Sequence, residues 1–269
     1  MFIGRMKPDL VAPGYKVLAP RAHAKKNNYD ETYNTFGTSF SSPVVAGNAA
    51  LIRQYFEEGW FPCGSKSCNN NNSQTSNPSG SLVKAILMNG SIQTITNVQK
   101  VPAGQVLERV KEYDNNAGMG LVNMVNSLPL KGVNDLNGVV VNNRLINDGR
   151  FDTILIKTRS SCSSRDWVRT TLSWYDPPGA TNCAHCLIND LDLIVEKMNG
   201  RNVVEKTYYP NGLNRKDSKN NVERIRITNG GGGMLFKITV RASNLATRNQ
   251  KYSLIATGCF DVVEEKQGL

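Results

Sequence analysis

The spacing of apolar residues changes near residue 132, and this change limits what the 269-residue chain can fold into. Before it, the clearest pattern is a largely apolar run over residues 39–56 that leaves little polar surface, which predicts a buried helix. After it, short segments with period-two or β-branched character recur between turn residues, which predicts strands. The sequence therefore predicts two domains, residues 1–132 with helices and residues 133–269 built from strands.

The helix expected over residues 39–56 has little polar surface, and its small residues permit close approach of another backbone. We therefore expect it to be buried nearly all round. Pro43 is expected in its first turn, where a missing N–H costs nothing. The other elements predicted before residue 132 are a strand over 15–19, a polar loop over 21–36, a helix over 81–91 and a third helical segment from 118 to about 129.

The second domain shows seven strand-like segments and no convincing helix. Seven or eight strands of this kind predict a β-sandwich or jelly roll. Lys131-Gly132 is the expected linker between the domains. The segments are 139–141, 151–158, 168–175, 191–196, 222–228, 234–242 and 252–257.

The net charge of +10 raises the question of nucleic acid. The charge is spread evenly over the two domains, and no RNP, zinc-finger or helix-turn-helix pattern accompanies it, so we expect a diffuse basic surface and no nucleic-acid partner. No run of 18 apolar residues is present, so no membrane-spanning segment is expected.

Six cysteines in clusters favour disulfide bonds over the alternatives of free thiols and a metal site, and hence an oxidising compartment. Cys63 and Cys68 flank a short turn and can close a small loop. Cys183-Ala-His-Cys186 is a CxxC pair, but zinc needs a second pair and a redox motif needs a following helix. Six cysteines allow 15 pairings, so the pairing stays open. The remaining two are Cys162 and Cys259.

One segment has the chemistry of a nucleophile. Gly37-Thr38-Ser39-Phe40-Ser41-Ser42-Pro43 joins the polar loop to the helix. At a helix N-terminus, Ser39 lies beside unpaired N–H groups and the positive end of the helix dipole, which can hold an oxyanion. The alternative is that Ser39 only caps the helix. The sequence around it lacks the second glycine of an α/β-hydrolase nucleophile elbow, which excludes that class.

A wider comparison of motifs distinguishes these interpretations. The run Gly4-Arg5-Met6-Lys7-Pro8-Asp9-Leu10-Val11-Ala12-Pro13-Gly14, followed by Gly37–Gly47, resembles the C-terminal part of a subtilisin-like (subtilase) catalytic domain. That resemblance implies a serine endopeptidase acting on proteins or peptides, with Ser39 as nucleophile. It also implies that residues 1–132 are an incomplete part of an α/β domain with a parallel sheet.

The strand-rich half resembles the C-terminal jelly-roll domain of alkaline, oxidation-tolerant bacterial subtilases. The matching runs are Leu172–Gly179, Asn189–Leu193 and Asn220–Glu223. The fold class expected is thus an incomplete subtilisin-like α/β domain followed by an all-β sandwich.

A catalytic serine needs a base, and subtilases present Asp, His and Ser in that order. Only His23 precedes Ser39, outside a His-Gly-Thr motif, and His185 lies in the strand-rich half. Asn27 and Asn28 do not match the oxyanion-hole asparagine motif. We therefore expect the triad Asp and His in a missing N-terminal half, which is the expected partner, and an inactive chain without it. The alternative function is a pseudoprotease or a binding module that uses the jelly roll.

No cofactor is required for this chemistry. Asp190 and Asp192 lie two apart on an expected strand and are interpreted either as ligands of a structural calcium ion or as hydrogen-bond acceptors. Asn71 and Asn89 head glycosylation sequons; Asn89 is expected to be buried. Cysteines and family together predict a secreted protein or one of the endomembrane lumen.

Overall fold

The computed structural model describes residues 4–21, 32–66, 76–93, 113–160, 167–201, 203–228 and 230–268. In these residues the chain is mostly β-sheet, with two helices and three antiparallel sheets. The elements are β1 (Tyr15–Pro20), β2 (Thr32–Phe36), α1 (Thr38–Glu57), α2 (Gly80–Asn89), β3 (Asn137–Asn147), β4 (Phe151–Thr158), β5 (Val168–Trp174), β6 (Asn189–Met198), β7 (Val204–Tyr208), β8 (Val222–Ile227), β9 (Leu235–Leu245), β10 (Asn249–Gly258) and β11 (Phe260–Lys266).

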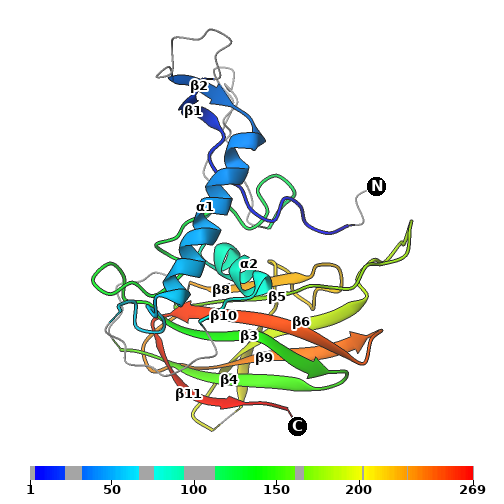
Figure 1. Cartoon of the computed structure of the whole chain (residues 1–269). Coiled ribbons are helices and arrows are strands. Elements are labelled where there is room, and N and C mark those ends of the chain that lie inside the picture. The colour runs from blue at the N-terminus through cyan, green and yellow to red at the C-terminus, as the bar shows by residue number, and fades with distance from the viewer. Residues whose placement is uncertain are drawn as a thin grey trace, which may run out of the picture.

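Two sheets face each other across the largest core (Figure 1). One has the strand order β3-β10-β5-β8 and the other β11-β4-β9-β6-β7. Leu172 and Leu254 of the first sheet pack in the same cluster as Leu193 and Ile238 of the second. All seven predicted strands are present, so the two-sheet architecture is what the alternating pattern indicated.

In the strand-rich half two strands were missed from the sequence, β7 and β11, and both lie at edges of the five-stranded sheet. β11 carries Glu264 and Glu265 and is exposed after its first residue. Edge strands often carry charge because charge blocks pairing with another chain. The alternation of apolar and polar residues in β7 and β11 is therefore too weak to predict a strand from the sequence.

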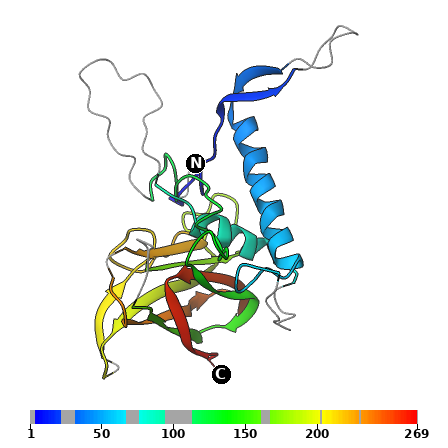
Figure 2. The same cartoon turned by 90° about the vertical axis from the view of Figure 1, so that its left-hand side faces the viewer.

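The helix α2 covers the outer face of the four-stranded sheet and makes a third layer (Figure 2). Asn89 at its end donates to Thr257 Oγ1 at 2.7 Å and accepts from Thr171 Oγ1 at 3.0 Å. Ser81 Oγ lies 2.9 Å from Ser253 Oγ. Asn89 is fully buried, as expected, so its sequon is closed to glycosylation.

Buried Arg224 of β8 joins the same sheet to the region behind α2. Its guanidinium donates to the carbonyl oxygens of Met88 at 2.7 Å and Met119 at 2.9 Å, and to Ser91 Oγ at 2.6 Å. It also lies 4.9 Å from the ring centre of Tyr113. The strand-rich part therefore holds the end of α2 and the segment around residue 119 through one charged side chain.

The expectation that the first long helix is buried nearly all round is wrong in these residues. Of the 20 residues of α1, only Ile52, Tyr55 and Phe56 are buried, and Leu51 is 55% exposed. The first turns of α1 and the β1–β2 hairpin project away from the rest of the molecule (Figures 1 and 2). The apolar side chains in those turns of α1, such as Phe40 and Val44, are only partly buried.

Three smaller expectations also need correction. Residues 32–36 of the expected loop form β2, because they pair antiparallel with β1. Pro43 is the sixth residue of α1, not part of its first turn, so it withholds an N–H from the Ser39 carbonyl.

The helical segment expected over 118–129 is absent. Gly118 and Gly120 have φ of +58° and +107°, and a Cβ on either would collide with the backbone of Pro8 or Ile92. The backbone at these glycines lies against neighbouring backbone, and their positive φ values are incompatible with an α-helix.

The parallel sheet expected for residues 1–132 is not present among the described residues. Their only parallel pairing is a single bridge between Val11 and Leu121. The domain boundary near residue 132 and the jelly-roll topology stay predictions; β3 begins at Asn137. Neither described helix combines the length and the apolar character needed to span a membrane.

Candidate active site

Ser39 is exposed at the second position of α1. The residue before the helix is Gly37, with φ of +142°, and no side chain caps the first turn. Ser39 is therefore not a capping residue. The first N–H groups of a helix have no carbonyl partner within it, and the positive end of the dipole lies there. The hydroxyl thus lies beside donors that can stabilise an oxyanion.

Gly14 holds the turn that presents Ser39. Its carbonyl accepts a hydrogen bond of 2.8 Å from Gly37 N. A Cβ on Gly14 would collide with Ser41 Oγ and lie 2.8 Å from the Gly37 carbonyl oxygen. A side chain at position 14 is therefore excluded, because it would push the turn and the start of α1 away.

Asp9 fixes the preceding motif to α2. Its carboxylate lies 2.7 Å from Lys7 Nζ and 3.2 Å from Lys84 Nζ. Burial opposes ionisation of Asp9, but the two lysines outweigh it and lower its pKa. Burial likewise lowers the pKa of Lys84, against the attraction of Asp9. This carboxylate is therefore committed to ion pairs and does not act as the orienting acid of a triad.

The described residues do not supply a base for Ser39. His185 is exposed in the loop between β5 and β6, and no hydrogen bond joins it to Ser39. His23, Asn27 and Asn28 lie outside the described residues, as does Asn71. The nucleophile candidate is thus presented without its partners in this part of the chain.

The acidic residues of β6 lie in a separate buried group. Asp192 binds Lys216 Nζ at 2.6 Å and accepts from Ser243 Oγ. Burial, and then the nearby Asp192, raise the pKa of Asp190 to about 6. Glu223, fully buried, accepts from Leu193 N at 2.5 Å, and burial raises its pKa well above the usual value.

These contacts bear on the calcium interpretation. Asp192 has a lysine as its cation, and in the described ranges no three His, Cys, Asp or Glu side chains are arranged to hold a metal ion. The calcium interpretation stays an untested prediction.

The disulfide interpretation is supported by one complete pair. Cys183 and Cys186 are bonded, with their Cα atoms 5.4 Å apart. Cys63 and Cys259 also each take part in a disulfide. Cys68 and Cys162 lie outside the described residues, so the remaining pairing stays open.

Comparison with known proteins agrees with the motifs. Residues 2–120 match the model of the subtilase family, Peptidase_S8. Two serine protease/ABC transporter B family proteins of Dictyostelium discoideum, tagB and tagA, are 26% and 27% identical to this chain over 95% and 94% of its length. The subtilisin-like protease SBT3.12 of Arabidopsis thaliana is 26% identical over 51% of the chain.

Residues 2–120 therefore match the subtilase family, and we call them the subtilase segment. The chain spans only 15%, 14% and 18% of these three relatives. The strand-rich half lies beyond the family match, although the alignments with tagA and tagB extend into it.

Sequence reasoning named Ser39 as the candidate nucleophile but missed residues that hold this part of the chain in place. Arg224 was not singled out, because nothing in a strand pattern shows which polar side chain points to a helix end. Gly14 was part of the recognised motif, but sequence reasoning assigned it no role. The Pro13-Gly14 pair indicated a turn, whereas the close approach of Ser41 to Gly14 is visible only in the folded chain.

Proposed function

We propose that this chain is the C-terminal part of a subtilisin-like serine endopeptidase. Ser39 attacks the carbonyl carbon of a peptide bond, and its own N–H is one donor to the oxyanion. A histidine from another part of the protein takes the hydroxyl proton and gives it to the leaving amine, oriented by an aspartate. The observation that carries the proposal is the exposed, non-capping Ser39 at the start of α1, inside the segment that matches the subtilase family.

The missing catalytic groups are proposed to arrive with a segment that covers the exposed side of α1 and the β1–β2 hairpin. That surface is rich in apolar side chains: Leu18 is 66% exposed and Phe36 76% exposed. Exposed apolar patches of this kind mark interaction sites. The small residues Ala46, Gly47 and Ala50 are also exposed on α1 and would let another backbone approach closely.

The parallel bridge between Val11 and Leu121 supports the same arrangement. Val11 N donates to the Gly120 carbonyl at 2.9 Å, and Val122 N donates to the Val11 carbonyl at 3.0 Å. Parallel pairing is the geometry of sheets covered by helices, in contrast to the antiparallel sandwich. We infer that this bridge belongs to a parallel sheet whose other strands lie in the segment that covers α1 and the β1–β2 hairpin. We also infer that the strand-rich half is the jelly-roll domain of such a protease.

The test is covalent labelling with a fluorophosphonate, which reacts with an activated serine. This chain alone, the protein extended upstream in frame, and the extended protein with Ser39→Ala are incubated with the probe, and labelled peptides are mapped. Labelling of Ser39 in the extended protein alone is expected. Absence of labelling in a folded extended protein would overturn the proposal and favour a pseudoprotease or a binding module. Ser41→Ala is the matched control and should retain labelling.

A further inference from the structure

The loop between β5 and β6, residues 175–188, carries a disulfide with no part in peptide hydrolysis. Cys183 and Cys186 are bonded, and the two residues between them, Ala184 and His185, are exposed. The loop does not lead into a helix, so it lacks the setting of a thioredoxin-like catalyst. The loop is instead suited to be a disulfide that another thiol reduces.

The base of this loop is closed without the disulfide. The Asp176 carboxylate, 3% exposed, accepts hydrogen bonds from Asn189 N at 2.8 Å and from Ile188 N at 3.0 Å. These bonds hold the two ends of the loop together across its neck. The disulfide therefore fixes the shape of the tip alone, and opening it does not require the sandwich to unfold.

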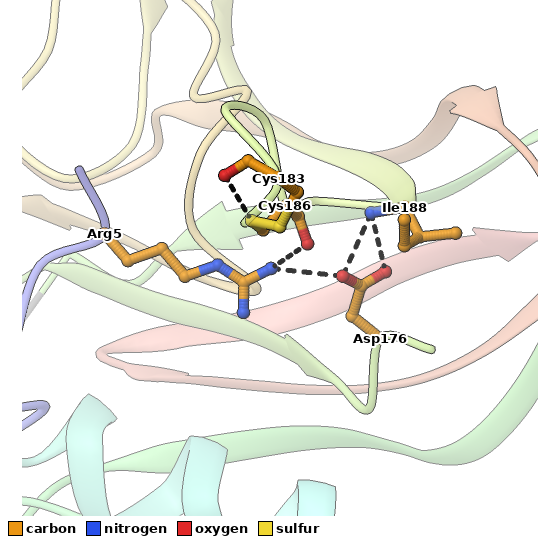
Figure 3. The surroundings of a disulfide bond; sticks show 5 residues. All are labelled: Arg5, Asp176, Cys183, Cys186 and Ile188. Carbon is orange, nitrogen blue, oxygen red and sulfur yellow. Dashed lines mark hydrogen bonds and ion pairs between the residues drawn. A yellow bond between two sulfur atoms is a disulfide. The ribbon is translucent and has the colours of Figure 1, made fainter. Parts of the chain in front are cut away.

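The tip holds a distant segment of the chain (Figure 3). One nitrogen of the Arg5 guanidinium, Nη2, donates to the Cys186 carbonyl oxygen at 2.8 Å and to Asp176 Oδ2 at 3.1 Å. The next residue, Met6, donates its N–H to Asn220 Oδ1 at 2.8 Å. These contacts dock the start of the N-terminal segment, residues 4–6, on the strand-rich half, whereas Asp9 and Val11 are held by Lys84 and by the chain at residues 119–122.

Access and charge both favour exchange at this disulfide. The two cysteines and Arg5 line an open cavity of about 600 Å³, large enough for a small reductant. A cation beside a cysteine stabilises its thiolate, and a stabilised thiolate leaves faster in exchange. Arg5 Nε is buried with no hydrogen-bond partner in the described ranges, so the guanidinium has an N–H left for a thiolate.

The size of the ring also favours opening. In the chain-entropy account, a cross-link stabilises the fold less when it closes a shorter loop. Here the bonded residues are three apart in sequence. Little of the stability of the fold therefore depends on this bond, and it can be broken in a folded molecule.

We propose that Cys183–Cys186 is a thiol–disulfide exchange site for dithiols, and that its reduction loosens the docking of residues 4–6 on the strand-rich half. A dithiol thiolate attacks one sulfur, forms a mixed disulfide and expels the other cysteine as a thiolate. The second thiol of the reagent then displaces the first cysteine. The protein disulfide gains two electrons and two protons, and the dithiol becomes a cyclic disulfide. This proposal stands independently of the peptidase activity.

The experiment is a titration of the oxidised chain with dithiothreitol in defined ratios of its reduced and oxidised forms. Thiols are trapped by alkylation and assigned to cysteines by peptide mass mapping, and hydrogen exchange of residues 4–6 is followed in parallel. Cys183 and Cys186 are expected to become alkylated before Cys259, in one step. Exchange in residues 4–6 is expected to rise by about tenfold or more in the same step, whereas the Val11 amide, bonded to Gly120, should keep its rate. Exchange across β10 should stay unchanged.

Two variants separate the disulfide from the ion pair. The double variant Cys183→Ser/Cys186→Ser should show fast exchange in residues 4–6 without reductant and no further response to it. Arg5→Gln should show fast exchange there in both redox states. If Cys259 is alkylated first, or if reduction leaves exchange in residues 4–6 unchanged, the proposal is overturned. Reduction of the wild-type chain tests the proposal even if the double variant does not fold.

Discussion

Replacement of Arg224 by methionine tests whether one buried side chain joins the strand-rich part to the subtilase segment. Arg224 is fully buried, and its three shortest hydrogen bonds go to Ser91 Oγ and to the carbonyls of Met88 and Met119. Methionine fills much of the same space but donates nothing. Each buried acceptor left without a partner costs about 1–3 kcal/mol, and relief from burying the guanidinium charge offsets part of that sum.

We expect Arg224→Met to lower the free energy of unfolding by about 3–5 kcal/mol, a large fraction of what a domain has. At a urea slope of about 2–3 kcal/mol per molar, the midpoint should fall by about 1–2 M. The assay is urea unfolding followed by tryptophan fluorescence, since Trp174 is buried in the sandwich core, and by circular dichroism.

Two further variants control this experiment. Arg224→Lys keeps the positive charge but loses the branched guanidinium with its several N–H donors, so we expect an intermediate loss of unfolding free energy. Arg241 is exposed on β9, and Arg241→Met should change stability by less than about 0.5 kcal/mol. A loss below about 1 kcal/mol in Arg224→Met would refute the reasoning, because it would mean that the three acceptors find other partners at little cost.

Three other predictions follow from the same structure. Gly14→Ala should lower the melting temperature of the chain and, in the upstream-extended protein, the rate of fluorophosphonate labelling, because its Cβ would collide with Ser41; unchanged labelling would mean that the turn yields. Gly47→Ala in α1, where a Cβ meets nothing within 4 Å, should raise the stability of this chain by about 0.5–1 kcal/mol; if another layer covers α1 in the extended protein, the gain should vanish there. Asp190→Asn should change the pH dependence of stability. The pKa of Asp190 is raised from 3.8 to about 6, so its protonated form contributes stability below pH 4 that is lost as pH rises through 6. After allowance for its partial exposure, the variant should be more stable than the wild type by about 1–2 kcal/mol at pH 7.5 and equal to it at pH 3.5, measured by urea unfolding; equal stability at both pH values would contradict the raised pKa.

Local patterns in the sequence determined much of this protein. The alternation of the strand-rich half located seven of its strands, because a sheet with one face on a core repeats every two residues. The Gly-Thr-Ser run and the Lys-Pro-Asp and Ala-Pro-Gly runs before it identified the nucleophile candidate, because they are contiguous and carry their own turn chemistry. The burial of Asn89 was also readable, since it ends an apolar helix.

Tertiary structure decided what depended on contacts between distant residues. The apolar character of α1 predicted a buried helix, yet in the structure only residues of its last turns, Ile52, Tyr55 and Phe56, are buried. The sequence around Gly118 and Gly120 is compatible with a helix, but in the fold the backbone of Pro8 and Ile92 lies against these glycines. The links from Arg224 to Met88 and from Arg5 to Cys186 span 136 and 181 residues. No local periodicity encodes such pairs, because only the folded backbone brings a donor and its acceptors to within hydrogen-bonding distance.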